Sequence, residues 1–327
     1  MLIINILQII KINIYIKDYY NKIEYKTIMK KLYIFLATAT VLFVNSLFGQ
    51  NYQLPYYDFN DWYNTTDNLP SHWFSYSSIQ CTFDQTLCDM AIANGVFHNH
   101  HNKVRGFSGS GTDWAIQLYT VEKLGKNING ALTTGKIALN SDDFSSTENY
   151  VYTQRGGSCK WPFSGRPDSL SMRVKFSFLQ NTYPKASARI HIHGDVDYED
   201  LYVGSFSDPQ PGKIANLKAE IQNPATTPNS NGVYKSDWTR FAYKFNYWDV
   251  NNNLLDTPTL ANTVQPYYLL ASLSTNKNLG VGEGDSVSFD QITCIYDKGL
   301  ASLTINGIEQ DSIREIFNRA EFNTHDM

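Results

Sequence analysis

Polar side chains alternate with apolar ones between residues 189 and 199, and their types could do chemistry. The polar set is Arg189, His191, His193, Asp195, Asp197 and Glu199. Alternate residues of an extended strand point the same way, about 6.5 to 7 Å apart. A His-x-His pair can bind a metal ion, and two carboxylates at that spacing can bracket a glycosidic bond. A solvated strand face of mixed charge accounts for the same residues, and we favour this interpretation.

More histidines lie in the segment FHNHHN, at His98, His100 and His101. Imidazole nitrogens suit several transition metals as ligands. The segment has the composition of a loop, and we favour a loop without a metal.

Trp161 lies in the segment GGSCKWPFSGRP, whose glycines and prolines predict a loop. Sugar binding needs a flat apolar surface for the C–H face of a ring and planar polar side chains for its hydroxyls. Arg155 and Arg166 flank Trp161 and could supply the hydrogen bonds, so these three are the candidate ligand-binding residues. The alternative for Trp161 is packing over the end of a β-sandwich. The other tryptophans, which are weaker candidates, are Trp62, Trp73, Trp114, Trp238 and Trp248.

Short strands joined by turn-rich loops would position these residues. The expected strands cover residues 114–120, 135–139, 170–178, 189–199, 241–247 and 267–274. Loops such as SDPQPGK and NPATTPNSNG exclude long regular elements between them. The helical pattern that we find lies at residues 311–320, within residues 311–327, which we interpret as a C-terminal tail or a truncated linker. The pattern predicts an all-β antiparallel sandwich over residues 50–310.

The last strand of this pattern changes phase. Val287 and Phe289 share one face, whereas Ile292 and Cys294 share the other. A slip of one residue within a strand is what a β-bulge produces, and bulges re-aim side chains near sites and sheet edges. The slip falls at Asp290, which is therefore a candidate site residue.

Residues 1–49 form an expected leader. Residues 29–49 read MKKLYIFLATATVLFVNSLFG, two lysines and an apolar run followed by small and polar residues, which is typical of an export signal. The apolar run is short for a membrane span, and we find no longer one later in the sequence. We therefore expect an exported protein, periplasmic, cell-surface or extracellular, without a transmembrane segment and monomeric.

The charge balance argues against nucleic acid as a partner. The chain has a net charge of −4, and the leader holds lysines in excess over Asp18 and Glu24, so the exported part is more acidic still. An acidic protein without a lysine-arginine cluster is poorly suited to nucleic acid or to an anionic membrane surface.

Four cysteines in an exported chain suggest disulfides, with three possible pairings. Cys81 and Cys88 could close a short local loop, which is the pairing that we favour. Cys159 and Cys294 would then form a long-range bridge or stay as buried free thiols.

Several segments together resemble the putative carbohydrate-metabolism (PCMD) domain family of exported bacterial proteins. The matching segments are FNDW with LPSHW, INGALTTG, GRPDSLSMRVKF, and PYYLLASLSTN with GEGDSVSFDQITCIY. The resemblance spans most of residues 58–307 and implies a jelly-roll sandwich of the galactose-binding or carbohydrate-binding-module type. It implies a fold more firmly than a function.

The same resemblance implies a structural calcium ion. Jelly-roll modules of this type often hold Ca²⁺ between their first and last strands through carboxylates and carbonyls. Asp58 and Asn60 open the domain and Asp290 lies near its end, so these three are the candidate metal ligands. Asn60 departs from the family pattern, in which an acidic residue is usual. The alternative is that Asp290 only caps a bulge.

We find no nucleophile elbow, phosphate-binding loop or zinc-hydrolase motif in the sequence. The interpretation we favour is a non-catalytic domain that binds a glycan. The alternatives are a glycoside hydrolase whose acidic pair the sequence does not locate, and a cell-surface adhesion or structural module.

Overall fold

The computed structural model describes residues 52–62, 68–82, 85–123, 125–140, 149–201, 212–249, 253–255, 265–278, 280–296, 303–305 and 308–310. All of them belong to one compact unit, Asn51–Met327. The expected leader and the tail at 311–327 lie outside the described residues.

Two large antiparallel sheets build the sandwich. Sheet 1 runs in the order β14-β10-β19-β3-β2, with β15 also paired to β10. Its strands are β2 (His101–Arg105), β3 (Trp114–Tyr119), β10 (Ser169–Phe178), β14 (Tyr234–Lys235), β15 (Thr239–Lys244) and β19 (Ser286–Ile295).

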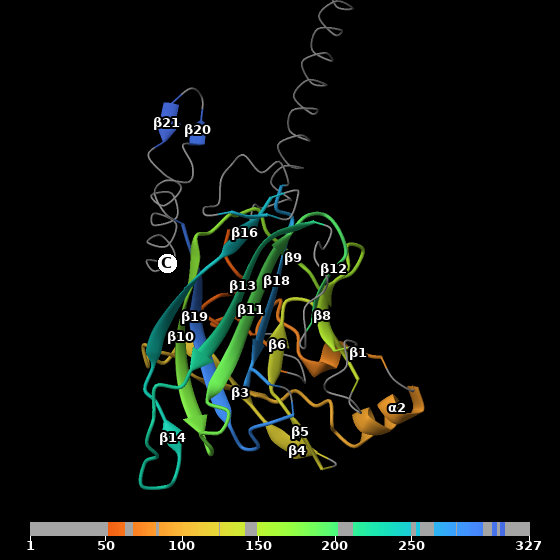
Figure 1. Ribbon diagram of the computed structural model, residues 1–327, viewed down its shortest axis with the longest axis vertical. Coiled ribbons are helices and arrows are strands. Elements are labelled where there is room, and N and C mark those ends of the chain that lie inside the picture. Colours follow the sequence, from red (N-terminus) through yellow and green to blue (C-terminus); the bar gives the residue numbers. More distant parts are fainter. Residues whose placement is uncertain are drawn as a thin grey trace, which may run out of the picture. The chain divides into compact units, whose positions relative to one another are not determined.

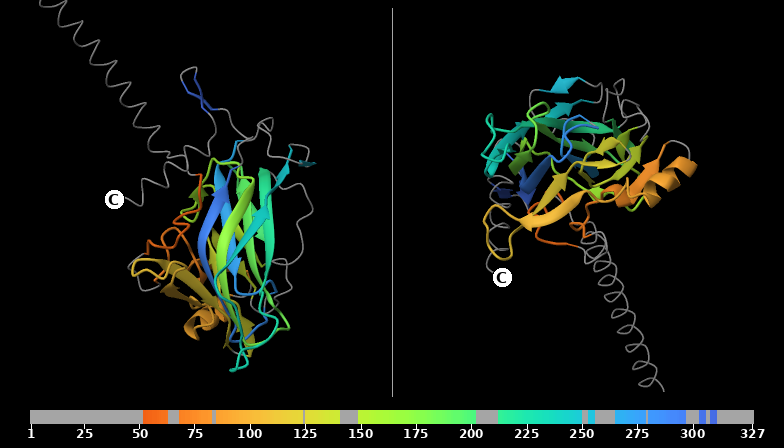
Figure 2. Two further views of the ribbon diagram at one scale, coloured as in Figure 1. Left: turned by 90° about the vertical axis from the view of Figure 1, so that its left-hand side faces the viewer. Right: turned by 90° about the horizontal axis from the view of Figure 1, so that it is seen from below.

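Sheet 2 runs in the order β17-β16-β13-β11-β18-β6, with β9 also paired to β18. Its strands are β6 (Ala131–Thr133), β9 (Trp161–Pro162), β11 (Lys185–His193), β13 (Lys213–Gln222), β16 (Asn246–Trp248), β17 (Leu254–Leu255) and β18 (Tyr268–Ser274). The long strands of both sheets run in the same general direction in Figure 1, and Figure 2 shows the sheets as stacked layers.

The main core fills the space between sheets 1 and 2. Alternation along β10 buries Met172 and Val174, and alternation along β11 buries Ile190 and Ile192, all within one hydrophobic cluster. Each fully buried aliphatic side chain of this kind stabilises the fold by about 1.5 to 3 kcal/mol relative to exposure. The outward residues of the same strands are free to form surface features, because strand side chains alternate between faces.

A third sheet covers part of the outer face of sheet 2. Sheet 3 has the order β1-β7-β8-β12, with strands β1 (Ile79–Cys81), β7 (Lys136–Leu139), β8 (Tyr150–Thr153) and β12 (Tyr198–Leu201). A second hydrophobic cluster joins Ile137, Val151 and Tyr198 of sheet 3 to Leu270 of β18. The half of sheet 2 nearer to β13 and β16 is not part of this cluster.

The remaining described elements are short. They are the turn η1 (Tyr76–Ser78), the helix α2 (Gln85–Ala93), and the hairpins β4 (Val121–Lys123) with β5 (Lys126–Ile128) and β20 (Leu303–Ile305) with β21 (Ile308–Gln310). No helix within the described ranges is long and apolar enough to cross a membrane.

The predicted all-β jelly-roll sandwich is confirmed. Three details of the prediction are wrong. The segment 189–199 is two strands, because β11 ends at His193 and β12 starts at Tyr198 in another sheet. The segment 241–247 divides in the same way between β15 and β16. The helix α2 was missed because its apolar residues do not keep to the buried side: Cys88 and Ala91 are buried, whereas Met90 and Ile92 are exposed.

Candidate functional site

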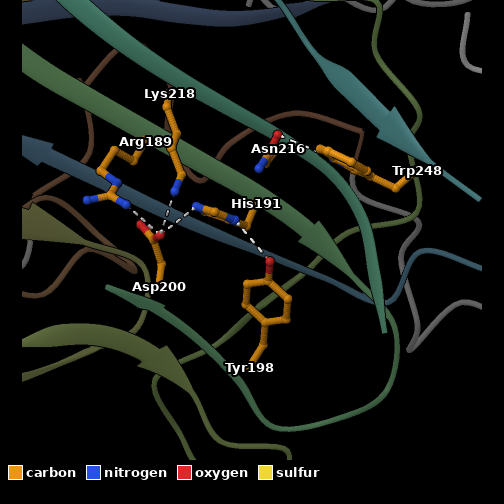
Figure 3. Close-up of polar contacts among 7 residues, drawn as sticks. All are labelled: Arg189, His191, Tyr198, Asp200, Asn216, Lys218 and Trp248. Atoms are coloured by element: carbon orange, nitrogen blue, oxygen red, sulfur yellow. Dashed lines mark hydrogen bonds and ion pairs between the residues drawn. The ribbon is translucent and has the colours of Figure 1, made fainter. Parts of the chain in front are cut away.

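Charged side chains converge where β12 crosses the outer face of β11 (Figure 3). Asp200 of β12 accepts a hydrogen bond from the guanidinium of Arg189 at 2.7 Å. His191 Nε2 lies 3.1 Å from the same carboxylate oxygen, and Lys218 Nζ of β13 lies 3.8 Å from it. The His191 Nδ1 atom and the hydroxyl of Tyr198 are hydrogen-bonded at 3.1 Å. We call these five residues the Asp200 cluster.

Burial and charge fix the protonation of the Asp200 cluster. Burial alone would raise the pKa of Asp200, but His191, Arg189 and Lys218 outweigh it and hold that pKa below its usual value. Burial also lowers the pKa of His191 against the attraction of Asp200. Asp200 is therefore a carboxylate, and His191 is a neutral imidazole beside it.

The Asp200 cluster joins β12 of sheet 3 to β11 and β13 of sheet 2. The side chains of Asp200 and His191 are each 4% exposed, so a substrate has little access to them. Breaking a buried ion pair leaves an uncompensated charge, which makes such a pair strongly resistant to separation. The favoured interpretation of a solvated strand face is therefore wrong for His191 and His193, which are both buried because β12 covers them.

The acidic residues that follow lie in the turn and on β12. Asp195 pairs with Arg155 at 2.6 Å, and Asp197 accepts from the Arg155 backbone N–H. Partial burial, and then the charge of Asp197, raise the pKa of the Glu199 carboxyl. The even spacing along one strand that motivated a carboxylate pair does not exist, because the chain turns between His193 and Tyr198.

A groove of about 300 Å³ crosses the outer face of sheet 1. Its lining comes from β2, β3, β19, β10 and β14 and from Trp238, which follows β14. The lining residues are Val104, Arg105, Gln117, Lys175, Phe176, Ser177, Lys235, Trp238, Ser286 and Ser288. We call this feature the sheet 1 groove.

Strand pairing explains the polar floor of the sheet 1 groove. Gln117 is the register partner of Ser288, and Ser288 is the partner of Lys175, so outward side chains form a row across three strands. Their inward neighbours fill the core. The half-buried ring of Trp238 borders this row of amide, hydroxyl and ammonium groups. An aromatic ring beside short polar side chains is the combination that binds a sugar ring.

The predicted residues Trp161, Arg155 and Arg166 lie elsewhere. Trp161 belongs to β9, packs against the main core, and donates from Nε1 to the carbonyl of Gln53 at 2.9 Å. Arg155 is engaged by Asp195, as described above. Arg166 is half-buried, and burial lowers its pKa against the influence of Tyr247. Ligand contact by these three residues stays a prediction.

Asp290 lies at the predicted bulge. Across β10 and β19, Ser171 pairs with Thr293 and Arg173 pairs with Asp290, so β19 has an extra residue. Gln291 has a φ of 49°, the left-handed conformation that such a bulge requires of one residue. The sequence therefore located the irregularity correctly.

The Asp290 carboxylate is fully buried and accepts two backbone bonds, from Phe107 N–H at 2.7 Å and from Gln291 N–H at 2.7 Å. Burial raises its pKa to about 7, against these two bonds and with help from the charges of Asp113 and Asp58. A carboxyl with that pKa is partly protonated at neutral pH.

The other two predicted calcium ligands are near the same place. Asn60 donates to Asp58 at 3.1 Å, and its Oδ1 accepts from the Trp114 N–H at 2.8 Å. Asp58 is close enough to affect the pKa of Asp290. Among the described residues, no group of three or more His, Cys, Asp or Glu side chains converges as a metal site. Calcium binding here stays a prediction, with Asp58, Asn60 and Asp290 as its ligands.

The disulfide joins Cys81 of β1 to Cys88 of α2, with the Cα atoms 6.1 Å apart. It attaches the helix to sheet 3. Cys159 and Cys294 are buried free thiols, so the long-range bridge, one of two alternatives, is not formed.

The histidines of FHNHHN have separate partners. His100 is buried, bonds to the Val96 carbonyl at 3.2 Å, and has a pKa that burial lowers to about 4. His101 Nε2 donates to the Asn68 carbonyl at 3.1 Å. His98 and His101 line a cavity of about 590 Å³.

Sequence reasoning missed the sheet 1 groove, although one signal was present. The outward residues of β10, which include Arg173, Lys175 and Ser177, were visible as a polar face. Trp238 was one tryptophan among several. The pairing of both β14 and β15 with β10 brings Lys235 and Trp238 next to that face.

Comparison with known proteins gives distant likenesses. No family model and no curated protein matches the chain. A structure described as a putative glycoside hydrolase from Bacteroides thetaiotaomicron has 11% identity and a TM-score of 0.44, covering 74% of this chain and 70% of that chain. One with the same description from Bacteroides vulgatus has 16% identity and a TM-score of 0.33, covering 61% and 78%. A carbohydrate-binding module specific for non-crystalline cellulose has 8% identity and a TM-score of 0.28, covering 60% and 79%. With TM-scores below 0.5, none of them supports an argument about function.

Proposed function

We propose that this protein is a non-catalytic module that binds a glycan in the sheet 1 groove. The observation that supports the proposal is the position of Trp238 beside Gln117, Ser288 and Lys175 in one groove. The indole ring would stack on the C–H face of a sugar, and the amide, hydroxyl and ammonium groups would bond its hydroxyls.

The groove suits a chain of sugars better than a single one. It crosses five strands, and neighbouring strands lie about 4.8 Å apart, so its floor is roughly 19 Å wide. No Asp or Glu is among the described residues that line it, and the proposal is therefore binding rather than hydrolysis.

Affinity gel electrophoresis over a panel of polysaccharides tests the proposal. We expect the wild type to be retarded by at least one polysaccharide, and Trp238→Ala to bind it about tenfold more weakly, a loss of about 1.4 kcal/mol. Trp248→Ala is the matched control, because Trp248 lies on β16 of sheet 2. Equal losses in both variants, with both folded, would contradict the assignment of the groove.

A reducing-sugar assay on the same samples separates binding from hydrolysis. The alternative of a glycoside hydrolase has one observation in its favour, the raised pKa of Glu199 beside Asp197. Turnover that is lost in Glu199→Gln would support the hydrolase. Neither binding nor turnover would support an adhesion or structural module instead.

Export and membership of the PCMD family are further parts of the proposal. The lysines and apolar run at 29–49 support export, and the segments quoted above support the family. N-terminal sequencing of protein recovered outside the cytoplasm should find a start near Gln50. A mature chain that retains Leu32 would contradict removal of the leader.

A further inference from the structure

We propose that the ligand of the sheet 1 groove is an acidic polysaccharide, one that carries carboxylate or sulfate groups. This inference rests on the proposed function and specifies the chemical class of the glycan. Its basis is the distribution of unpaired positive charge over the two sheets.

Three cations line the groove, and no carboxylate accompanies them in the described lining. They are Arg105, Lys175 and Lys235. Arg105 donates to the carbonyls of Ser110 and Gly111 and stacks over Trp114 at 4.2 Å, which holds its guanidinium in place. Neither Lys175 nor Lys235 has an ion-pair partner in the part of the chain that the structure describes.

The basic surface continues beyond the groove on the same face. Arg173 of β10 and Arg240 of β15 are directly opposite each other in the strand register. Like charges at opposed positions of an antiparallel pair destabilise the sheet. Arg240 bonds to Ser171 at 2.7 Å and Arg173 lies over the ring of Phe107 at 4.0 Å, and neither of these partners carries a negative charge. An arrangement that costs stability in the free protein is expected where a ligand compensates it.

The described carboxyls near this face lie outside the lining of the groove. Asp290, the register partner of Arg173, is fully buried and accepts from the backbone N–H groups of Phe107 and Gln291. Asp58 and Asp113 lie near Asp290, and Asp237 precedes Trp238 in the sequence. The charged residues among the described lining are therefore all cations.

Sheet 2 shows the opposite distribution. Four cations on or next to this sheet have carboxylate partners: Lys185 and Lys277 pair with Glu220, and Arg189 and Lys218 pair with Asp200. Lys213 of β13 lies over the ring of Trp248 instead. The chain as a whole has a net charge of −4. A groove lined by one sign of charge attracts a ligand of the opposite sign, even on a protein whose net charge is negative.

Binding measurements with paired polymers test the inference. Polygalacturonate is compared with the neutral polymer obtained from it by carboxyl reduction, and dextran sulfate is compared with dextran. We expect the full-length wild type to bind one acidic polymer at least tenfold more tightly than its neutral counterpart at low salt. The affinity should fall as sodium chloride is raised from 50 to 500 mM, because salt screens exposed charges. The acidic polymer that binds more tightly identifies carboxylate or sulfate as the recognised group.

Charge variants localise the effect. The double variant K175M/K235M should bind the acidic polymer about tenfold more weakly and its neutral counterpart unchanged, since each exposed charge contributes up to about fivefold. Lys123→Met, the same change on β4, is the control and should bind as the wild type does. Equal binding of the acidic and neutral polymers would overturn this inference and leave the proposed function intact. Failure to bind either would overturn both. Equal losses in K175M/K235M and Lys123→Met would show attraction without a site and would also overturn the inference.

Discussion

The Asp200 cluster and the sheet 1 groove contain the same kinds of residues, but the cluster is buried and paired whereas the groove is open. Both have arginine and lysine on the outward face of a sheet, beside polar neighbours. In the Asp200 cluster, β12 covers the face and places a carboxylate among the cations. In the groove no described strand covers the face, and neither Lys175 nor Lys235 has an ion-pair partner among the described residues. The covering strand therefore distinguishes a structural ion-pair cluster from a binding groove in this protein. The residue types alone do not distinguish the two.

The largest effect on stability is expected from removing the carboxylate of the Asp200 cluster. Asp200→Ala leaves Arg189 and His191 buried without their carboxylate, and we expect the free energy of unfolding to fall by about 3 to 5 kcal/mol. Urea denaturation followed by tryptophan fluorescence measures it. Asp200→Asn, which keeps an acceptor for His191, should lose less. If Asp200→Ala instead weakened glycan binding in the folded protein, the cluster would be part of the binding site and the comparison would fail.

Asp290 provides a second test, because it is a fully buried acid on β19 of sheet 1. Its pKa of about 7 in the folded state exceeds the unfolded value of about 3.9, so the fold holds a proton that the unfolded chain releases. This contribution to stability is present at pH 4 and is lost as pH rises to 7, by about 1 kcal/mol per pH unit. Asp290→Asn should flatten that slope relative to the wild type.

Calcium should have the same flattening effect if it binds at Asp58, Asn60 and Asp290. A cation favours the ionised carboxylate, and an ion that binds only the folded state raises the melting temperature by mass action. Differential scanning calorimetry of metal-free protein with calcium or with chelator measures the shift. Identical melting temperatures would falsify the calcium site.

Local features of this protein could be predicted from its sequence, whereas features that depend on the order of the strands could not. Alternation along residues 170–178 was enough to predict β10, and the phase slip was enough to predict the bulge at Asp290, because both are local. The end of β11 at His193 was not predictable from alternation, since the apolar phase continues through Val196 and Tyr198 into a strand of another sheet. The groove was not predictable for a related reason. It is lined by five strands from β14 to β2, which are far apart in the sequence and become parts of one surface only through the strand order of sheet 1.

A smaller effect separates a packing tryptophan from a binding one. Trp161 is partly buried against the main core and bonds to Gln53, so Trp161→Ala should lower the free energy of unfolding by about 2 kcal/mol. Trp238→Ala should cost less than about 1 kcal/mol of stability, although it weakens binding. Thermal melting of both variants decides this. A Trp161→Ala protein of normal stability that no longer binds glycan would restore Trp161 as a ligand contact.

The smallest effect on stability is expected at Lys218, the exposed member of the Asp200 cluster. The Lys218 side chain is 46% exposed and lies 3.8 Å from Asp200, which is the weak end of ion pairing. Lys218→Met should change the free energy of unfolding by less than about 0.5 kcal/mol. A loss above 2 kcal/mol in the same denaturation assay would contradict this expectation. It would mean that the exposed Lys218 stabilises Asp200 as strongly as a buried cation does.

The reactivity of the two free thiols can report how often the protein unfolds locally or globally. Burial raises the pKa of the Cys294 thiol far above its usual value, and a thiol reacts as its thiolate, so Cys294 is inert to alkylation while the sandwich is intact. Cys294 lies on β19 in the interior of sheet 1, and modifying it requires separation of the two large sheets. Cys159 lies in the connection between β8 and β9, where a local fluctuation can expose it. Alkylation rates at the two positions would therefore report local and global opening separately in the unmodified protein.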